Sequence, residues 1–396
     1  MNSQTQRFRQ QIADQFIHSL QEKSLNWERP WIAPSLPINA ATEKPYKGIN
    51  RLSLMMAAFQ NQYSDPRWAT FVQIQKNNWK LKAGSKGTQI EYWLPFDPKE
   101  KQFISWLSYE NLSADEQQKI SFRAKYYYVF NAAAISGIPP LPIQENKNVR
   151  LDNLVSTLSQ NMKIPILPDV SGQAYYSPDE DTIHIPPAEQ FKNFLSYNTT
   201  CFHELAHATG AAQRLNRNIR NPFGSAEYAY EELIAEIASV FMAGNLNLVL
   251  DESDLNNHKA YVQSWIHVIT DRPEALFSAI KEASKACDYM EYHADLIPQS
   301  EFEKRFRLYQ TEQSLEKESL LQHEVKRNGY RITPALAPAI SQLAQCAPDL
   351  CRLSLIKEHF QNQSFPNESA KSCINKLASE LRQQEKSLIA FQEPSI

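Results

Sequence analysis

The sequence has neither a disulfide framework nor a long apolar run. Its five cysteines are scattered and include no CxxC pair, which excludes a small disulfide-stapled scaffold and is typical of a reducing cytosol. No apolar run approaches the roughly 20 residues of a membrane span, and the polar N-terminus has no apolar secretory signal segment. We therefore expect a soluble, cytoplasmic protein with no membrane partner.

The formal net charge of −3 hides an asymmetry between two parts of the chain. Residues 1–150 hold 19 Lys and Arg against 12 Asp and Glu, a net charge of +7, whereas residues 151–396 hold 22 against 32, a net charge of −10. Six of the seven tryptophans also lie in the first part. A chain of 396 residues is too long for one ordinary core, so these differences predict at least two domains, each with its own apolar interior.

Hydrophobic periodicity predicts an α+β fold for the first part. Residues 7–23 carry an apolar side chain at every fourth position, which suits one face of a helix, and residues 50–60 are also expected to be helical. Residues 89–94 and 125–130 are rich in aromatic and β-branched residues, so we expect them to form strands.

The second part is predicted to be mainly helical. Its expected helices cover residues 151–162, 193–209, 227–246 and, as one or two helices, 257–291, with a hairpin over residues 174–185. The predicted order is a small α+β domain over residues 1–138, a proline-containing linker over 139–150, a mainly helical domain over 151–297 and a helical C-terminal extension over 298–396. The extension contains no motif with recognisable chemistry.

The segment His203-Glu204-Leu205-Ala206-His207 is the clearest chemical signal. Two histidines four apart lie on one face of a helix, where both can reach one Zn²⁺ ion at roughly 2.0–2.1 Å. Glu204 lies beside the first ligand, in the position of a general base that takes a proton from a metal-bound water. The pattern therefore predicts His203 and His207 as zinc ligands and Glu204 as the catalytic residue.

A catalytic zinc also needs a third protein ligand and an open position for water. Glu232 is the candidate third ligand, and Glu236, one turn further on, is a candidate outer partner that accepts a hydrogen bond from a ligand histidine. The alternative is that Glu231, Glu232 and Glu236 form a solvated acidic face. Apolar neighbours indicate a buried helix and favour the ligand interpretation.

These residues together predict a zinc metallopeptidase. Zinc would lower the pKa of its water towards about 7 and polarise a carbonyl, while Glu204 would take the proton. The hairpin around residues 182–185 could offer a strand edge to an extended peptide. Tyr228 and Tyr230 are candidates for stabilising the oxyanion, with an ordinary helical role as the alternative, and His184 is expected to be a strand residue rather than a ligand.

Further blocks of sequence accompany this segment. In the second part they are residues 202–210, 214–217, 223–225, 228–236, 261–266 and 285–290. In the first part they are residues 27–31, 45–50, 66–68, 86–88 and 129–131. Together they resemble the ArdC-type antirestriction proteins of conjugative plasmids, over about residues 5–295.

The resemblance implies a single-stranded-DNA-binding domain joined to a zincin-like metallopeptidase domain, in a protein that protects incoming mobile-element DNA from host restriction. The implied partners are single-stranded DNA, with double-stranded DNA as an alternative, and a protein substrate such as a host restriction or DNA-associated protein.

The basic, tryptophan-rich first part agrees with DNA binding, because single-strand binders combine a positive groove with aromatic platforms worth about 1–3 kcal/mol per stacked base. Most of the tryptophans should nevertheless belong to the core. The candidate stacking residues, of which we expect only two or three to be exposed, are Trp27, Trp31, Tyr46, Trp68 and Trp93. The candidate phosphate contacts are Arg51, Arg67, Lys82 and Lys86.

Two alternative functions stay open at this point. One is a DNA-binding shield with a structural, non-hydrolytic zinc, and the other is a cytosolic zinc peptidase with no DNA role. Glu204 favours a catalytic over a structural zinc, because a purely structural site needs no adjacent base.

Overall fold

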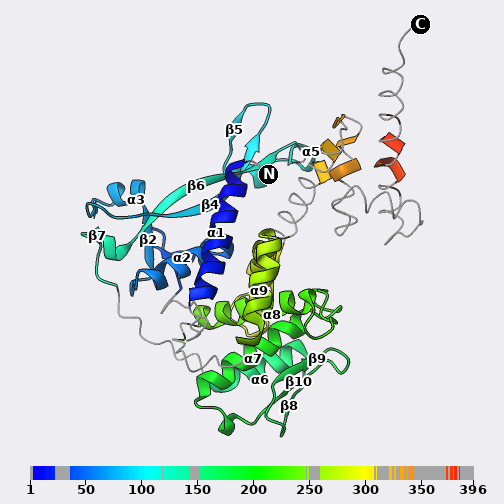
Figure 1. The fold of residues 1–396 in the computed structure, drawn as a ribbon. Coiled ribbons are helices and arrows are strands. Elements are labelled where there is room, and N and C mark those ends of the chain that lie inside the picture. Colours follow the sequence, from blue (N-terminus) through cyan, green and yellow to red (C-terminus); the bar gives the residue numbers. More distant parts are fainter. Residues whose placement is uncertain are drawn as a thin grey trace. The chain divides into compact units, whose positions relative to one another are not determined.

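The computed structural model describes residues 3–22, 36–117, 119–141, 151–246, 248 and 259–306, together with scattered residues after 308. The chain divides into two compact units, one formed by Arg7–Phe302 and the other by Met1–Gln6 with Glu303–Ile396. The N-terminal sheet and the helices of the predicted metal site both belong to Arg7–Phe302 (Figure 1). Much of the predicted linker, and most of the predicted C-terminal extension, lie outside the described residues.

The first part is built on an antiparallel pair of long strands, β4 (Thr88–Asp97) and β6 (Ser121–Asn131), which confirms the predicted strands. They lie inside a five-stranded sheet of order β1-β2-β6-β4-β5, whose other strands are β1 (Ile38–Asn39), β2 (Arg67–Thr70) and β5 (Gln102–Phe103). The smaller elements around it are α3 (Phe71–Lys76), α4 (Trp106–Glu110), α5 (Ala114–Gln117), the 3-10 turn Ala132–Ala134 and the two-stranded sheet of β3 (Lys80–Leu81) and β7 (Ile135–Ser136).

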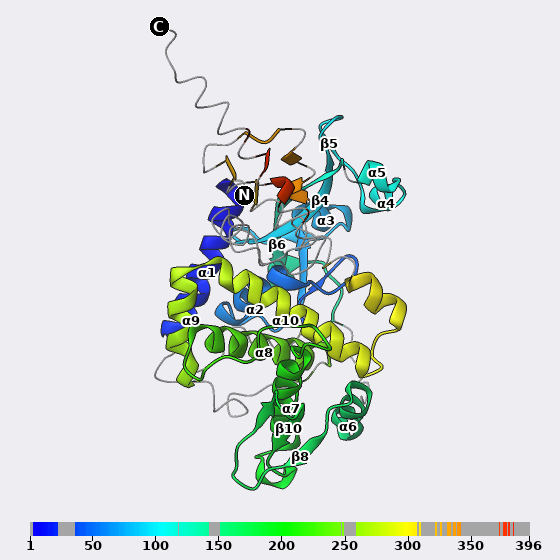
Figure 2. The same ribbon diagram turned by 90° about the vertical axis from the view of Figure 1, so that its right-hand side faces the viewer.

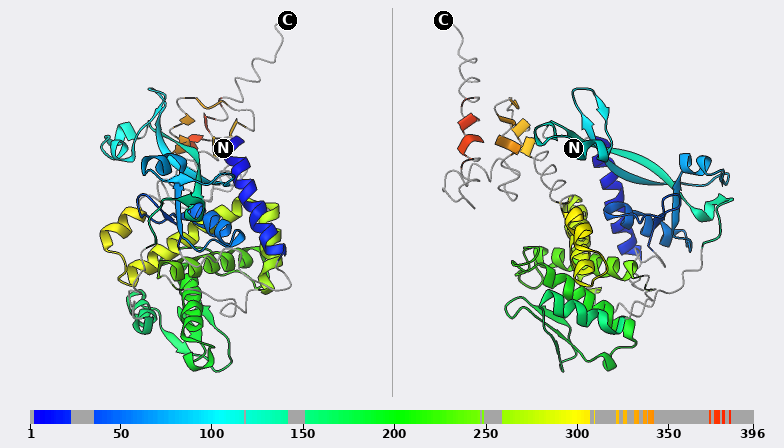
Figure 3. Two further views of the ribbon diagram at one scale, coloured as in Figure 1. Left: turned by 90° about the vertical axis from the view of Figure 1, so that its left-hand side faces the viewer. Right: turned by 180° about the vertical axis from the view of Figure 1, so that it is seen from behind.

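Two helices pack against the long strands. Helix α1 (Ser3–Glu22), dark blue in Figure 3, buries Phe8, Ile12, Phe16 and Leu20, which confirms the predicted periodicity. The centroid of its Phe8 ring lies 5.2 Å from that of Tyr126 on β6. Helix α2 (Gly48–Gln60) packs through Leu54 on the opposite face of the two strands, against Ile90 and Val129. The strands are therefore buried on both faces over part of their length.

Helix α2 also protects the exposed edge of β4 beyond the reach of the short β5. The Asn50 side chain accepts a hydrogen bond from the Glu91 backbone N–H at 2.8 Å and donates one to the Glu91 carbonyl at 2.6 Å. A neighbouring strand would make the same two bonds, so one amide side chain satisfies an edge that would otherwise pair with another chain.

The second part is mainly helical, as predicted. Its helices are α6 (Leu151–Met162), α7 (Phe194–Thr209), α8 (Ala226–Asn245), α9 (Lys259–Asp271) and α10 (Glu274–His293), with a 3-10 turn at Ala188–Gln190. Figure 2 shows α7 below α8 and α10, beside a small sheet. That sheet has the order β8-β10-β9, with β8 (Ile166–Pro168) parallel and β9 (Tyr175–Ser177) antiparallel to the central β10 (Thr182–Ile185).

The largest apolar core crosses the boundary between the two parts. It joins Phe16 of α1 and Met55 of α2 to Phe202 of α7 and Phe241 of α8. Separate interiors for each part were therefore the wrong expectation for these two helices, whose apolar faces are shared between the sheet and the helical part. Among the described residues, no helix combines the length and the apolar character needed to cross a membrane.

Candidate metal centre

Helix α7 carries the two candidate histidines. The Asn193 side chain caps its first turn by accepting a hydrogen bond from the Ser196 backbone N–H at 2.8 Å. His203 and His207 then project from one face of the helix, with ring centroids 4.8 Å apart. Both lie in the half of the helix that is almost continuously buried.

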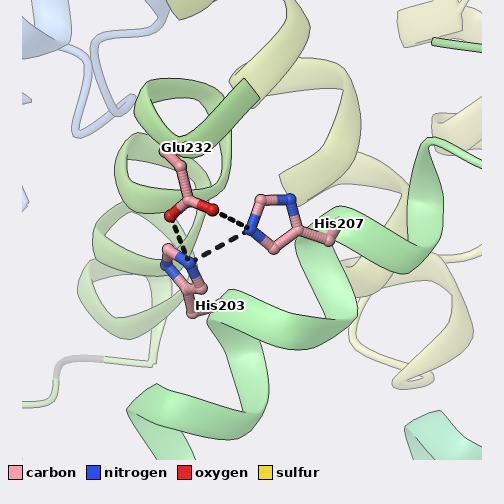
Figure 4. A group of neighbouring side chains, drawn as sticks. All are labelled: His203, His207 and Glu232. Carbon is pink, nitrogen blue, oxygen red and sulfur yellow. Dashed lines mark hydrogen bonds and ion pairs between the residues drawn. The ribbon is translucent and has the colours of Figure 1, made fainter. Parts of the chain in front are cut away.

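Helix α8 supplies the third candidate ligand across from this face (Figure 4). The Glu232 carboxylate oxygens lie 3.5 Å from His203 Nε2 and 3.5 Å from His207 Nε2. The two Nε2 atoms are 3.2 Å apart. The predicted ligands His203, His207 and Glu232 are thus brought together by two consecutive helices, α7 and α8.

These separations suit a metal ion. Ligands at about 2.0–2.1 Å from a tetrahedral ion are about 3.3 Å from one another, close to the observed spacing of 3.2–3.5 Å. Each of the three residues offers one ligand atom, and these atoms lie within 4.8 Å of one another. Three protein ligands leave a fourth tetrahedral position for water or substrate. The donor set therefore fits a divalent metal.

The pKa shifts of the site follow from burial and close charges. Burial opposes ionisation of Glu232, but the charge of His207 and a hydrogen bond with His203 outweigh it and lower the pKa of Glu232 to about 2. Burial also opposes protonation of His203, but hydrogen bonds with Glu232 and Glu236 raise its pKa to about 10. Both shifts favour the charged forms of His203 and Glu232.

Glu204, the predicted general base, is buried next to His203. Burial raises the pKa of its carboxyl group, while the charges of His203 and His207 and a hydrogen bond from the Tyr176 backbone act in the opposite direction. A carboxylate with a raised pKa is a better proton acceptor than an ordinary surface glutamate. Its environment is therefore suited to proton transfer.

Glu236 occupies the place predicted for an outer partner. It is fully buried, and its Oε2 lies 3.6 Å from Nδ1 of His203, on the side of the ring away from Glu232. Sequence reasoning gave no such position to Glu231, yet its Oε1 lies 3.3 Å from Nδ1 of His207. The sequence did contain one signal for this position, the adjacent pair Glu231-Glu232. Consecutive side chains on a helix point about 100° apart, so the two glutamates were bound to have different neighbours.

The other candidate residues around the site have different hydrogen-bond partners. Tyr228 makes a side-chain hydrogen bond with Glu232, so its hydroxyl lies at the ligand set. Tyr230 bonds instead with Ser278, and burial raises its pKa. His184 pairs with Glu180 at 3.0 Å, in keeping with the expected strand residue.

The hairpin around residues 182–185 offers a strand edge through its first strand, β9. Those residues form β10, which has a neighbour on each side, whereas β9 is an edge strand of the same sheet. The backbone of Tyr176, in the middle of β9, hydrogen bonds to Glu204. The edge next to Glu204, the predicted general base, is therefore β9.

The candidate aromatic DNA contacts are mostly unavailable for stacking. Trp68 is 1% exposed, because it packs in the small core between β2 and α2. The half-buried Trp93 donates its indole N–H to Glu91 at 2.6 Å, and the hydroxyl of the half-buried Tyr46 accepts a bond from Asn39. The remaining two candidates, Trp27 and Trp31, lie outside the described residues.

The candidate phosphate contacts divide in a similar way. Arg51 is buried and donates to the Phe241 carbonyl of α8 at 2.7 Å, so assigning it to DNA was wrong. Arg67 is half-buried and paired with Asp65 at 2.7 Å. Lys82 and Lys86 are exposed, although Lys82 also donates to a backbone carbonyl at 2.8 Å. Of the four candidates, only these two lysines are exposed, as a phosphate contact requires.

Comparison with known families places both parts of the chain. Residues 6–130 match the N-terminal domain of anti-restriction factor ArdC, and residues 153–282 match the zincin-like metallopeptidase domain. The fold and the site thus define an ArdC N-terminal domain followed by a zincin-like metallopeptidase domain. The chain is an ArdC-type protein, as the sequence blocks predicted.

Solved structures agree with this assignment. The metal-free structure of the antirestriction ArdC protein from plasmid R388 is 27% identical, covers 74% of this chain and 99% of its own, and superposes with a TM-score of 0.58. The Mn(II)-bound structure of the same protein is 28% identical, covers 72% of this chain and 97% of its own, with a TM-score of 0.57.

Curated sequences give two kinds of relative. A DNA primase TraC of Escherichia coli is 32% identical over 85% of this chain, but the match spans only 31% of that primase. The uncharacterized protein y4eC of Sinorhizobium fredii (strain NBRC 101917 / NGR234) is 28% identical over 71% of this chain and 90% of its own length. The chain therefore spans about a third of the first relative and most of the second.

Proposed function

We propose that this protein is a cytoplasmic antirestriction factor that hydrolyses a protein substrate at a zinc site and binds single-stranded DNA through its N-terminal domain. The observation that carries the hydrolytic half is the convergence of His203, His207 and Glu232 at tetrahedral spacing beside the buried Glu204. The proposed substrate is a host restriction or DNA-associated protein, and the biological effect is protection of incoming mobile-element DNA.

The residues of the site divide the work of peptide hydrolysis. A divalent metal at this site would polarise the scissile carbonyl and a water molecule. Glu204 would take the proton of that water and pass it to the leaving amine, a task for which a raised pKa is suited. Tyr228, whose hydroxyl bonds Glu232, is positioned to donate to the developing oxyanion.

The β9 edge would align the substrate. An extended peptide can pair with the backbone of an edge strand, and pairing along β9 brings its carbonyls past Tyr176, whose backbone bonds Glu204. The aligned substrate carbonyl would then lie close to Glu204, the residue proposed to transfer the proton.

Zinc is the proposed metal because two histidines, one glutamate and an open position form a common catalytic zinc set. The Mn(II) in the related ArdC structure makes manganese the competing candidate. A site of nitrogen and oxygen ligands binds Zn²⁺ more tightly than Mn²⁺ in vitro whichever metal it uses in the cell, so the metal content of the protein purified from its cells decides between them. Manganese as the bound metal would contradict the proposal of zinc.

Glu204→Gln tests hydrolysis. The variant should bind metal as the wild type does and lose cleavage by about 10²–10⁴-fold, the usual contribution of general acid–base catalysis. A survey of newly formed protein N-termini in cells expressing wild type or variant reads out the activity, and Glu227→Gln, an exposed position on α8, is the control. Identical N-termini in both, with metal bound, would favour a DNA-binding shield with a non-hydrolytic metal.

The proposed DNA contact lies on one face of β4 and β6. Tyr92 pairs with Lys125 and Ile90 pairs with Tyr127, so Tyr92, Lys125 and Tyr127 share that face. Tyr92 is 49% and Tyr127 38% exposed. Arg123 lies on the same face and is also exposed. We name Tyr92, Arg123, Lys125 and Tyr127 the tyrosine strip.

The tyrosine strip combines the two features that single-strand binding needs, aromatic surfaces and positive charge. Its cations are held over rings, with Arg123 Cζ 3.5 Å from the Phe96 centroid and Lys125 Nζ 3.9 Å from that of Phe103. Cations held beside exposed aromatic side chains suit single-stranded DNA, because the cations can contact its phosphates while its bases stack on the aromatic rings.

A double substitution of Tyr92 and Tyr127 by serine tests the strip. Binding of a fluorescent oligothymidylate should weaken at least tenfold, since each lost stacking contact contributes about 1–3 kcal/mol. Tyr128→Ser is the matched control, because Tyr128 is exposed on the opposite face of the same strand. No salt-dependent binding by the wild type would contradict the DNA half, and a larger loss in Tyr128→Ser would move the contact to the other face.

A further inference from the structure

Two adjacent glutamates of α8 have different neighbours in the metal centre. Glu232 lies between the Nε2 atoms of both histidines. Glu231 instead approaches His207 from the other side of its ring, with Oε1 at 3.3 Å from Nδ1. Both side chains are buried, so neither belongs to a solvated acidic face.

Glu231 is held in place by Arg217. The guanidinium donates to both carboxylate oxygens, from Nε to Oε2 at 3.0 Å and from Nη2 to Oε1 at 2.7 Å. Such a two-pronged bond fixes the plane of the carboxylate as well as its position. A buried carboxylate needs a partner of this kind, because an unpaired buried charge is strongly unfavourable.

Arg217 is anchored in turn to the end of the metal-site helix. It donates to the Thr209 hydroxyl at 2.9 Å and to the Ala206 carbonyl at 2.8 Å. The Ala206 carbonyl lies in the last turn of α7, directly before His207 in the sequence. One side chain therefore ties the C-terminal turn of α7 to Glu231 of α8.

The loop that carries Arg217 folds back tightly on α7. The Arg217 backbone N–H donates to the Gly210 carbonyl at 2.8 Å. A Cβ at Gly210 would lie 2.4 Å from Ile219 Cγ2 and 3.0 Å from Arg217 Nη2, so a side chain there would displace the loop. Glycine directly after the metal-site helix thus leaves room for Ile219 of the loop that carries Arg217.

We propose that Glu231 and Arg217 form a positioning pair that orients His207 for the metal. With Nδ1–H donated to Glu231, the His207 ring presents the lone pair of Nε2 towards Glu232 and the metal position. Glu236 has the equivalent place beside His203. Helix α8 then supplies one ligand and an outer partner for each histidine.

The pair is tested by metal affinity and by the tautomer of His207. Glu231→Gln in the full chain should weaken binding of Zn²⁺ and of Mn²⁺ by about 10–100-fold, the usual effect of removing an outer partner. In ¹⁵N spectra of the Zn²⁺-loaded protein, His207 should be protonated at Nδ1 in the wild type and lose this uniform state in the variant. Glu227→Gln, exposed on the same helix, should change neither readout.

Arg217→Lys keeps the positive charge and loses the two-pronged bond. It should give a smaller loss of metal affinity than Glu231→Gln, and it decides the matter if the glutamine variant does not fold. Metal affinity within twofold of the wild type in the folded variants, with His207 unchanged, would overturn the pair.

This inference rests on the proposed metal binding, and the two can fail separately. A wild type that binds neither metal would contradict the proposed function. A wild type that binds metal, with variants that bind it equally well, would contradict the positioning pair alone.

Discussion

The metal centre and the N-terminal sheet use their buried carboxylates in different ways. In the sheet, buried Glu91 accepts hydrogen bonds from Trp93 at 2.6 Å and from Tyr126 at 3.1 Å and lies 3.4 Å from Arg9. In the metal centre, the carboxylate of Glu232 instead lies 3.5 Å from each of two histidine nitrogens, the spacing expected of ligands to one metal ion. A carboxylate with donors of its own stabilises the fold, whereas one placed at ligand distances suits a cation.

The difference extends to the cations of the two regions. Arg217 of the metal centre is buried and fully committed to Glu231 and the end of α7. Arg123 of the sheet lies exposed over a ring. The first arrangement fixes a geometry, and the second leaves charge available to a partner in solution.

Removal of a metal ligand should have the largest effect. If zinc binding survived it, the contrast between the metal centre and the N-terminal sheet would no longer hold. His207→Ala leaves two of three protein ligands, so bound Zn²⁺ should fall from one per chain to near zero after desalting. Added Zn²⁺ should then no longer raise the Tm, whereas saturation at 100 times Kd contributes about 2.7 kcal/mol to the wild type. His184→Ala, outside the ligand set, should behave as the wild type, and a zinc-loaded His207→Ala would contradict the site.

Substitution of Arg51 tests whether this arginine stabilises the fold or contacts DNA. Its guanidinium is buried, donates to the Phe241 carbonyl and lies 4.1 Å from the Phe241 ring centroid. Arg51→Met should therefore lower the free energy of unfolding by about 1.5–3 kcal/mol, measured in urea. Lys86→Met is the exposed control. Unchanged stability together with weaker DNA binding would restore the original assignment of Arg51 to DNA.

Proton release should mark metal uptake at the site. The pKa of His203 is raised to about 10, above the usual value of about 6.5, so its protonation stabilises the metal-free protein fully below about pH 6.5. This contribution is lost as the pH rises towards 10, and metal binding displaces the same proton. Calorimetry in buffers of different ionisation enthalpy should show about one proton released near pH 8. Release of none would show that His203 is neutral in the metal-free protein.

Exposed lysines of the sheet should have the smallest effect. Lys86→Gln should reduce the slope of log affinity against log salt by about one and weaken oligothymidylate binding only slightly. Titrations at several salt concentrations measure it. A slope equal to that of the wild type would remove Lys86 from the contact surface and leave the tyrosine strip as the candidate.

Features of this chain that depend on neighbouring residues in the sequence were predictable. Features that depend on contacts between residues far apart in the sequence were not. The helix bearing His203 and His207 follows from local spacing, and Glu232 and Glu236 were expected to share a face because they lie one helical turn apart. Trp68 and Arg51 failed as DNA contacts because side-chain exposure depends on packing between distant elements. Arg51 reaches a carbonyl of α8, 190 residues away in sequence, and no local pattern records that contact.

Glu231 shows the same limit inside the metal centre. The sequence pattern assigned no role to Glu231, yet the loop carrying Arg217 returns over α7 and pairs with it. A loop of this kind has no periodicity from which its path could be predicted. The ligands were therefore predictable and the residues that orient them only in part.

X-ray absorption at the zinc edge tests the central claim most directly. The zinc-loaded protein should show two imidazole nitrogens at about 2.0–2.1 Å, one carboxylate oxygen at about 2.0–2.2 Å and one oxygen from water, with no sulfur. His207→Ala should lose one imidazole, and Glu204→Gln should keep the full pattern. A closed shell of four protein ligands, or a shell containing a cysteine sulfur, would contradict an open catalytic site built by His203, His207 and Glu232.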